Sequence, residues 1–343
     1  MKMTTLSNWT QPLSTMVSLL APNETSGENE ESDLQNESWE FYIYYYGMFC
    51  LVAVVNLTGN SLVISTIIRH RQLQYCCNWF LLSLGFSDLL QGFVYPIYNL
   101  SHIEISAISE PLGAWSLCQF LLTEVLALDL GSSYHLVCIT VIRYIAVVHP
   151  LKYHNYVNEK RILVCIVFIW LSTQTTIILL YTIYIPEGEY VGACRYENIF
   201  RFAHTNILFI IQLFLPVTIM TCLYIPLIRI ARKQAKVIAI QECSVTRSAI
   251  TSQERKSTYM VTSLLGCFAI FWTPTVIYFY ASIALKGNIN HYIRATVRIL
   301  LFMNSAINVF VYAGRDGEFR NILKKDLKKL SSFCKCCHKS DFH

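Results

Sequence analysis

The sequence predicts an all-α membrane protein, a seven-transmembrane helix bundle followed by a short C-terminal interfacial helix. Two compositional facts point there: 54% of the 343 residues are hydrophobic and only 14% are charged. Soluble domains carry about 25% charged residues, so this chain has too few to cover a water-exposed surface. The third observation is seven apolar stretches, each near or above the roughly 20 residues that a helix needs to cross a bilayer.

These stretches define the predicted spans in order along the chain. Segments rich in charged or turn-forming residues separate them, and lipid favours helices because backbone polar groups must be satisfied within each segment. The predicted spans are 41–68, 78–101, 116–142, 162–185, 202–228, 257–285 and 293–313. With their connections they form a predicted bundle over 41–314. Inverted repeats typical of secondary transporters are not evident in this pattern.

Basic residues are distributed unequally between the two sides of the predicted bundle. Most Lys and Arg lie in the loops after spans one, three and five and in the segment after span seven. The opposite side has only Lys2, Arg195, Arg201 and Lys286 outside the spans. The positive-inside rule therefore predicts a multi-pass protein with its N-terminus outside and its C-terminus in the cytoplasm.

The segment 1–40 is polar and acidic, which predicts a disordered extracellular arm. It contains N-glycosylation sequons at Asn8, Asn23 and Asn36, and a fourth sequon at Asn99 lies at the outer end of span two. No long apolar region precedes a small-residue cleavage site, so the first span is expected to act as an uncleaved signal anchor.

Only two of the 13 cysteines fall on the predicted outer side. Cys118 begins span three and Cys194 lies between spans four and five. The outside is oxidising and these two thiols have no competitors there, so a Cys118–Cys194 disulfide is favoured over two free thiols.

The segment 315–343 is predicted to be a cytoplasmic amphipathic helix and a basic, Cys-rich tail. Apolar residues recur at helical spacing among Lys and Arg over 317–330, which indicates a helix lying on the membrane lipid. Cys334, Cys336 and Cys337 follow. Palmitoylation is favoured over a metal site, because adjacent ligands in one loop give poor tetrahedral geometry.

Polar residues at membrane depth are functional candidates, because an ionisable group in a span is costly. Asp88 lies midway along span two. Taken alone, this acid is consistent with a proton relay, an ion site or a buried hydrogen-bonded acid.

Further motifs occur in order along the spans. They are Gly59-Asn60, Leu84-Gly85-Phe86-Ser87-Asp88, Trp115 with Cys118, Arg143-Tyr144, His149 to Tyr153, Trp170, Pro216 with Tyr224, Phe268 to Pro274, Asn304 to Tyr312, and Phe319-Arg320. In this set the chain resembles the rhodopsin-like (class A) G-protein-coupled receptor family over about residues 40–330. Two positions depart from the family pattern: Ile142 replaces an acid before Arg143, and Val309 replaces a proline after Asn308.

The resemblance implies a plasma-membrane receptor that converts extracellular ligand binding into heterotrimeric G-protein activation. It adds arrestin and receptor kinases as partners. The sequence shows no catalytic triad, metal motif or phosphate loop at plausible depth, so no enzymatic activity is expected, and no nucleic-acid partner is expected either. The coupling and switch positions carried over from the family are Arg143, Tyr144, Leu151, Tyr224, Glu254 and Tyr312. Glu254 would hold Arg143 in the inactive state; alternatively it is a solvated acid at a helix end.

The family's sodium site maps onto five oxygen-bearing residues: Asp88, Ser132, Asn304, Ser305 and Asn308. Carboxylate, hydroxyl and amide oxygens suit a hard cation, so sodium is the expected allosteric ion. The alternative is a water-filled polar network of the same residues. No other metal and no cofactor is expected.

The family's ligand pocket maps onto Val125, Asp129, Trp272, Tyr278, Arg298 and Phe302. Amine receptors of the family carry an Asp where this chain has Val125, which argues against ordinary monoamine binding. Asp129 lies one turn deeper on the same helix face. Together with Arg298 it suits a small zwitterionic, amine-like or short peptide ligand; alternatively the two form a structural ion pair. Phe302 replaces the lysine that would bind retinal, which excludes opsin chemistry.

Two other functions remain open. One is a receptor-like protein that is constitutively active, or that forms heteromers without a ligand of its own, and Ile142 and Val309 keep this alternative open. A seven-span transporter or channel would need a continuous polar path, but charged residues become sparse between Asp88 and Arg143.

Overall fold

The computed structural model describes residues 39–74, 76–104, 111–184, 202–240, 245–285, 289–315 and 319–325, and these residues are almost entirely helical. The long helices are α3 (Trp39–Arg69), α4 (Cys76–Glu104), α5 (Pro111–Val148), α7 (Glu159–Tyr184), α10 (Leu215–Ile240), α11 (Val245–Ala284) and α12 (His291–Arg315). The shorter elements are the 3-10 turn η2 (Arg71–Leu73), α6 (Pro150–Tyr156), α9 (Phe202–Phe209) and the π-helical turn η3 (Ile210–Phe214).

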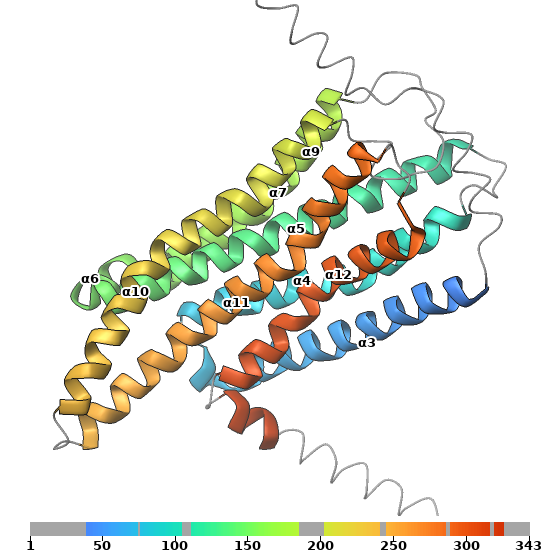
Figure 1. The fold of residues 1–343 in the computed structure, drawn as a ribbon. Helices are drawn as coiled ribbons and strands as arrows, with labels where there is room; N and C mark the ends of the chain where they lie inside the picture. The colour runs from blue at the N-terminus through green and yellow to red at the C-terminus, as the bar shows by residue number, and fades with distance from the viewer. Residues whose placement is uncertain are drawn as a thin grey trace, which may run out of the picture.

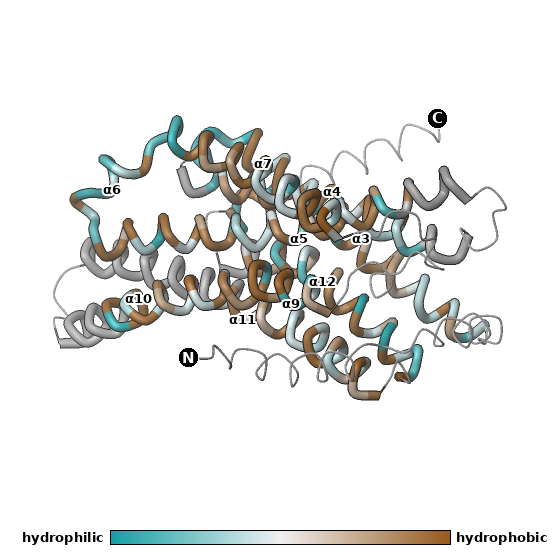
Figure 2. The backbone as a smooth tube through the Cα atoms, turned by 90° about the horizontal axis from the view of Figure 1, so that it is seen from above, coloured by the Kyte–Doolittle hydropathy of each residue, from teal (hydrophilic) through white to brown (hydrophobic). Residues whose placement is uncertain are grey.

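The predicted seven-span bundle is confirmed. Within the described residues seven helices are long and apolar enough to cross a membrane, with α9, η3 and α10 forming one continuous span. They lie side by side as an elongated bundle (Figure 1). Hydrophobic residues dominate the middle of the bundle and hydrophilic residues dominate α6 (Figure 2). A short helix over 319–325 follows α12, as the amphipathic pattern predicts.

Several helices continue beyond the predicted spans. The predicted break between spans five and six at 229–256 lies between the two candidate spans, but it is largely helical, because α10 continues to Ile240 and α11 begins at Val245. Apolar composition measures the part of a helix that crosses hydrocarbon, whereas Lys, Arg, Glu and Gln favour helix in water as well. The helices therefore extend past the membrane where their sequences become charged.

The core of the bundle consists of two hydrophobic clusters. Helix α5 is the most enclosed span, and it contacts α4, α7, α10 and α11. One cluster includes Leu84, Leu136 and Val309, and the other includes Tyr95 and Leu130. Between these positions lie buried polar residues: Asp88 and Gln91 in α4, and Ser132, Ser133 and His135 in α5. A polar layer therefore separates two apolar halves.

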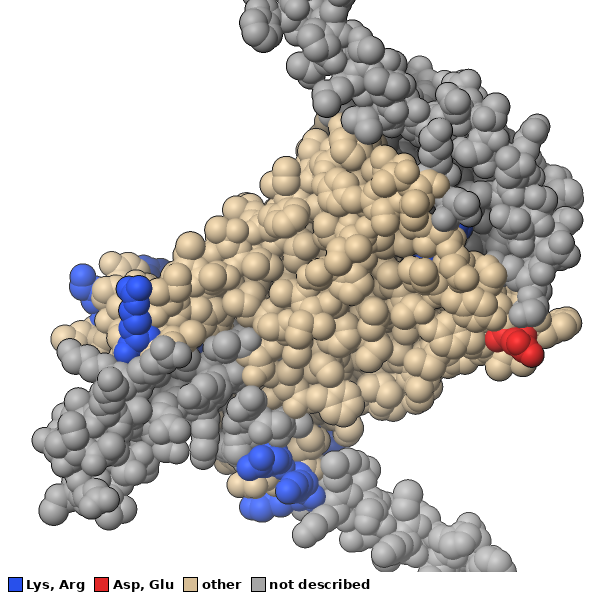
Figure 3. Space-filling model, viewed as in Figure 1, with Lys and Arg blue, Asp and Glu red and all other residues tan. Residues whose placement is uncertain are grey.

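Charged side chains lie toward the two ends of the outer surface of the bundle (Figure 3). On the face shown in Figure 3, Lys and Arg gather near α6 and α10 and near the short helix after α12, while acidic residues are seen at the opposite end. The surface between is uncharged on this face. Many large apolar side chains of the spans are exposed, including Phe168, Leu171 and Ile270. This is the surface of a protein solvated by lipid.

Candidate ligand pocket and buried polar network

A cavity of about 110 Å³ lies among α4, α5, the α9–η3 segment, α11 and α12. Its walls come from the C-terminal half of α4 and the first halves of α5 and α12, which is the half of the bundle predicted to face outside. The lining residues are Tyr95, Tyr98, Asn99, Leu122, Val125, Leu126, Asp129, Leu208, Phe209, Gln212, Trp272, Thr275, Tyr278, Phe279, Arg294, Val297, Arg298 and Leu301.

Five of the six predicted pocket residues line this cavity: Val125, Asp129, Trp272, Tyr278 and Arg298. Phe302 does not. Its ring is buried and stacks on Tyr95 at 4.9 Å and on Phe49 at 5.7 Å between ring centroids. The prediction was wrong for Phe302 because aromatic neighbours on α3 and α4 hold its ring inside the core of the bundle.

The π-helical turn η3 helps to form one wall of the pocket. Pro216 has no N–H to donate to the carbonyl of Gln212 one turn earlier, so regular α-helix is disfavoured there. The Tyr134 hydroxyl of α5 donates to the Ile211 carbonyl within the turn, at 3.3 Å. The segment thus places Phe209 and Gln212 on the cavity wall.

Asp129 is buried at the wall of the cavity and is bound through only one of its oxygens. Gln91 Nε2 donates to Asp129 Oδ1 at 2.5 Å. Within the described part of the chain, Asp129 Oδ2 has no hydrogen-bond partner. The hydrogen bond that holds this carboxylate comes from Gln91 of α4.

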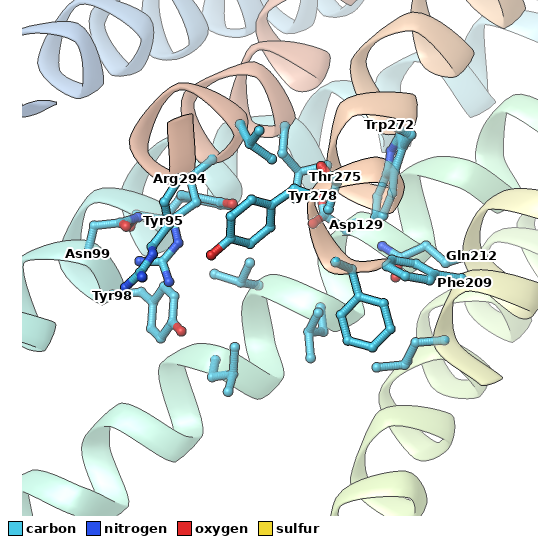
Figure 4. A pocket seen from close by; sticks show the side chains of 18 residues that line it. Tyr95, Tyr98, Asn99, Asp129, Phe209, Gln212, Trp272, Thr275, Tyr278 and Arg294 are labelled. Carbon is cyan, nitrogen blue, oxygen red and sulfur yellow. The ribbon is translucent and has the colours of Figure 1, made fainter. Parts of the chain in front are cut away.

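Three more buried polar atoms of the pocket wall have no hydrogen-bond partner in the part of the chain that the structure describes. They are Gln212 Nε2, Trp272 Nε1 and Thr275 Oγ1. In Figure 4, Asp129, Thr275, Trp272 and Gln212 lie toward one side, and Tyr95, Tyr98, Asn99 and Arg294 toward the other. An unsatisfied buried polar group costs about 1–3 kcal/mol, so water or a ligand must satisfy these atoms.

The predicted sodium-site residues come together around Asp88. Its side chain is fully buried; Ser132 Oγ donates to Oδ1 at 3.1 Å and Asn308 Nδ2 donates to Oδ2 at 2.8 Å. Asn304 and Ser305 are buried on the same stretch of α12. Among the described residues no Lys, Arg or His pairs with Asp88, so this carboxylate needs either a proton or a small cation. The oxygen-rich surroundings fit a hard cation.

Gln91 is the main functional candidate that the sequence analysis missed. It is buried, and besides donating to Asp129 it accepts a hydrogen bond at Oε1 from Ser305 Oγ. The signal was available: Gln91 follows Asp88 by three residues, which places both on one face of α4. A polar side chain at membrane depth beside an acid was reason to include it.

The predicted switch residues lie at the opposite end of the bundle. Arg143 and Tyr144 are half-buried near the end of α5, and the Tyr144 ring packs against His149 at 5.9 Å. Ile142 and Tyr224 are buried in one hydrophobic cluster, whereas Leu151 is 95% exposed on α6. Glu254 belongs to α11 and Tyr312 to α12, but the side chains of both lie outside the described residues.

One predicted modification site is wrong. Asn99 is buried in the pocket wall, where it accepts a hydrogen bond from Tyr45 at 2.6 Å and its Nδ2 donates to the Tyr95 carbonyl at 2.8 Å. Nδ2 is the atom to which a glycan would be attached, so this side chain cannot carry one. The other predicted positions lie outside the described residues or have undescribed side chains: Asn8, Asn23, Asn36, Cys118, Cys194, Cys334, Cys336 and Cys337.

The bundle has seven spans and a pocket in the half that is predicted to face outside. A buried polar layer lies between this pocket and the opposite end of the bundle. This arrangement is that of a transmembrane receptor. The chain belongs to the rhodopsin family of seven-transmembrane receptors, whose sequence profile matches residues 59–312. The resemblance inferred from the motifs is thereby confirmed, and the protein is a receptor, not an enzyme. As a family member it is a multi-pass membrane protein with an extracellular ligand and a G protein as partners.

Similar proteins include receptors for small amines. The chain is 26% identical to octopamine receptor beta-2R of Chilo suppressalis, covering 84% of this chain and 80% of that one. It is 29% identical to the histamine H2 receptor of Rattus norvegicus, covering 78% and 74%. It is 28% identical to trace amine-associated receptor 1 of Macaca mulatta, covering 84% and 90%.

Proposed function

We propose that this receptor binds a small ligand carrying an ammonium group, with Asp129 as its counter-ion, and in response activates a heterotrimeric G protein. The observation that carries the proposal is Asp129 Oδ2, a buried carboxylate oxygen at the pocket wall without a hydrogen-bond partner in the described chain. An ammonium group donates up to three hydrogen bonds and supplies the missing charge. The apolar Val125 then contacts the body of the ligand.

The size of the cavity favours a small molecule over a peptide. A volume of about 110 Å³ holds several water-sized groups, since a single water needs at least about 10–15 Å³. The names of the relatives point to small amines as well: octopamine, histamine and trace amines. The ammonium would lie one helical turn deeper here than in receptors with an Asp at the position of Val125.

Two arginines extend the proposal to a second group on the ligand. Arg294 and Arg298 both line the pocket. A carboxylate on the ligand would meet guanidinium groups that are suited to bidentate pairing. We therefore include amino acids beside amines among the candidate ligands.

Sodium is proposed to bind at Asp88, with oxygens from Ser132, Asn304, Ser305 and Asn308 as further ligands. The support is a buried carboxylate without a cationic partner in the described chain, surrounded by hydroxyl and amide groups. Sodium would stabilise the inactive bundle by keeping this polar layer expanded. A water network is the competing occupant.

The receptor is proposed to lie in the plasma membrane with its C-terminus in the cytoplasm. The basic residues near α6 and α10 then face the G protein, together with the exposed Leu151. Arg143, Tyr144, Tyr224 and Tyr312 are the proposed switch positions. Arrestin and receptor kinases are proposed as further partners on the same face.

The test is nucleotide exchange on purified heterotrimeric G protein by the receptor in lipid nanodiscs. The panel consists of pairs that differ only by a carboxylate: 2-phenylethylamine and phenylalanine, tyramine and tyrosine, histamine and histidine. At least one compound should accelerate exchange in the wild type and lose potency in Asp129→Ala. High exchange without any compound, unchanged across the panel, would instead favour a constitutively active receptor. No exchange under any condition would refute G-protein activation.

A further inference from the structure

Gln91 joins three spans through a single side chain. It is buried in α4, its Nε2 donates to Asp129 Oδ1 of α5 at 2.5 Å, and its Oε1 accepts from Ser305 Oγ of α12. Asp129 belongs to the pocket wall and Ser305 to the polar layer around Asp88. The carboxamide of Gln91 is therefore a direct hydrogen-bonded link between these two sites.

The donor and acceptor roles in these two hydrogen bonds follow from the chemistry of Asp129, Gln91 and Ser305. An ionised carboxylate can only accept hydrogen bonds, so Asp129 must face the amide nitrogen of Gln91. The amide oxygen then faces Ser305, whose hydroxyl must donate. With its proton directed to Gln91, the Ser305 oxygen keeps its lone pairs available for another partner. Reversal of the amide would make Ser305 an acceptor and remove a lone pair from that partner.

We propose that Gln91 is a positioning residue that couples ligand binding at Asp129 to sodium binding at Asp88. This inference rests on the proposed function, because it requires an ammonium at Asp129 and sodium at Asp88. While Asp129 holds the amide nitrogen, Ser305 presents its lone pairs to the cation. A ligand ammonium on the free Oδ2 draws on the negative charge of the Asp129 carboxylate, which weakens the hydrogen bond from Gln91 to Oδ1 and frees the amide to donate to Ser305 instead. Ligand and sodium then weaken each other reciprocally.

The experiment measures thermal unfolding of the purified full-length receptor in nanodiscs against sodium chloride concentration. N-methyl-D-glucamine chloride keeps the ionic strength constant. The readout is the sodium concentration that gives half of the maximal stabilisation. A substitution with only a structural effect lowers the Tm at every sodium concentration but leaves this midpoint unchanged.

Gln91→Met keeps a side chain of similar length and removes both hydrogen bonds. We expect it to raise the sodium midpoint at least about fivefold, the effect of losing one hydrogen bond that orients a ligand oxygen. Gln91→Asn keeps the amide but is too short to span both partners, and it should shift the midpoint in the same direction. The matched control is Ser83→Ala, also in α4, which removes bonds to His135 and Trp170 outside this link. Its midpoint should equal that of the wild type.

Asp129→Ala is measured in the wild type and in Gln91→Met. The comparison separates coupling through Gln91 from direct attraction between the Asp129 carboxylate and the sodium ion. Coupling through Gln91 predicts that Asp129→Ala raises the sodium midpoint when introduced into the wild type. The same substitution should not raise the midpoint further when introduced into the Gln91→Met variant. Direct electrostatic attraction predicts the same fold-change in both backgrounds, which would overturn the proposal. Asp129→Asn keeps an acceptor for Gln91 while losing the charge, so coupling predicts a smaller shift than for Asp129→Ala.

Failure of the sodium site and failure of the coupling give different results. If sodium does not stabilise the wild type, or stabilises Asp88→Asn equally, the sodium site is wrong and the coupling falls with it. If Asp88→Asn abolishes the response but both Gln91 variants keep the wild-type midpoint, the sodium site stands and only the role of Gln91 is refuted. Should Gln91→Met not fold, Gln91→Asn provides the background for the same comparison.

Discussion

The side chain of Val309 in α12 packs directly against Gly59 in α3. A Cβ added to Gly59 would lie 3.0 Å from Val309 Cγ2, 3.1 Å from Cγ1 and 3.3 Å from Cβ. Resemblance to the family leads one to expect a proline at position 309. In this chain a branched apolar side chain at that position contacts the first span, so the absence of a side chain at Gly59 permits the close approach of α3 and α12.

Gly59→Ala should lower the thermal stability of the receptor, because Val309 is β-branched and has little freedom to move away. Overpacking of this kind costs about 1–3 kcal/mol. Gly47→Ala is the control in the same helix, since a Cβ there meets nothing within 4 Å. Addition of Val309→Ala should restore the stability of Gly59→Ala. Equal Tm values for both glycine variants would show that the contact is not tight.

Asn99 should carry no glycan although it lies in a sequon. The measurement is the mobility of the expressed receptor on gels before and after removal of N-glycans, for Asn99→Gln and for the single Asn8, Asn23 and Asn36 variants. Asn99→Gln should leave the glycan mass unchanged, whereas the variants of occupied sites in the predicted extracellular arm should lose mass. Loss of a glycan in Asn99→Gln alone would contradict the buried position of this side chain.

Cys194→Ser should reduce surface expression and thermal stability if Cys118 and Cys194 form the predicted disulfide. Closing a loop of this kind typically contributes about 2–4 kcal/mol. Cys118→Ser should give the same loss, and the double variant should lose no more than either single one. Additive losses from the two single variants would refute the pairing.

Basal signalling should be high, because Ile142 supplies no charge to restrain Arg143. Ile142→Asp should lower basal G-protein activation, and Glu254→Ala should raise it, by about tenfold or more for a charge-assisted contact worth roughly 1.5–3 kcal/mol. Ile142 is buried in an apolar cluster, so Ile142→Asn controls for the effect of polarity alone. Equal basal activity in all forms at matched surface expression would show that these positions do not set the equilibrium.

The fold was predictable because a segment that crosses lipid must be helical and apolar, and the sequence contains seven apolar stretches of sufficient length. Helix ends were less predictable, because charged residues continue α10 and α11 into water without an apolar signal. Most of the pocket followed from helical spacing and resemblance to the family. Asn99 and Phe302 were wrong and Gln91 was missed, since a one-dimensional pattern does not reveal the direction in which a side chain points.

The most direct test of the account compares one amine with its neutral analogue. The most potent amine of the panel and the alcohol that replaces its ammonium with a hydroxyl are titrated in the nucleotide-exchange assay. The wild type should prefer the amine by at least about tenfold, the effect of a charge-assisted hydrogen bond to Asp129. Glu124→Gln is the control, because this second acid of α5 pairs with Gln174 at 3.0 Å and is not among the residues that line the pocket.

Asp129→Asn should reduce the preference for the amine to near one while leaving the potency of the alcohol close to its wild-type value, and Glu124→Gln should keep the full preference. If Asp129→Asn retains the wild-type preference for the amine, Asp129 is not the counter-ion, and the central claim about this pocket is contradicted.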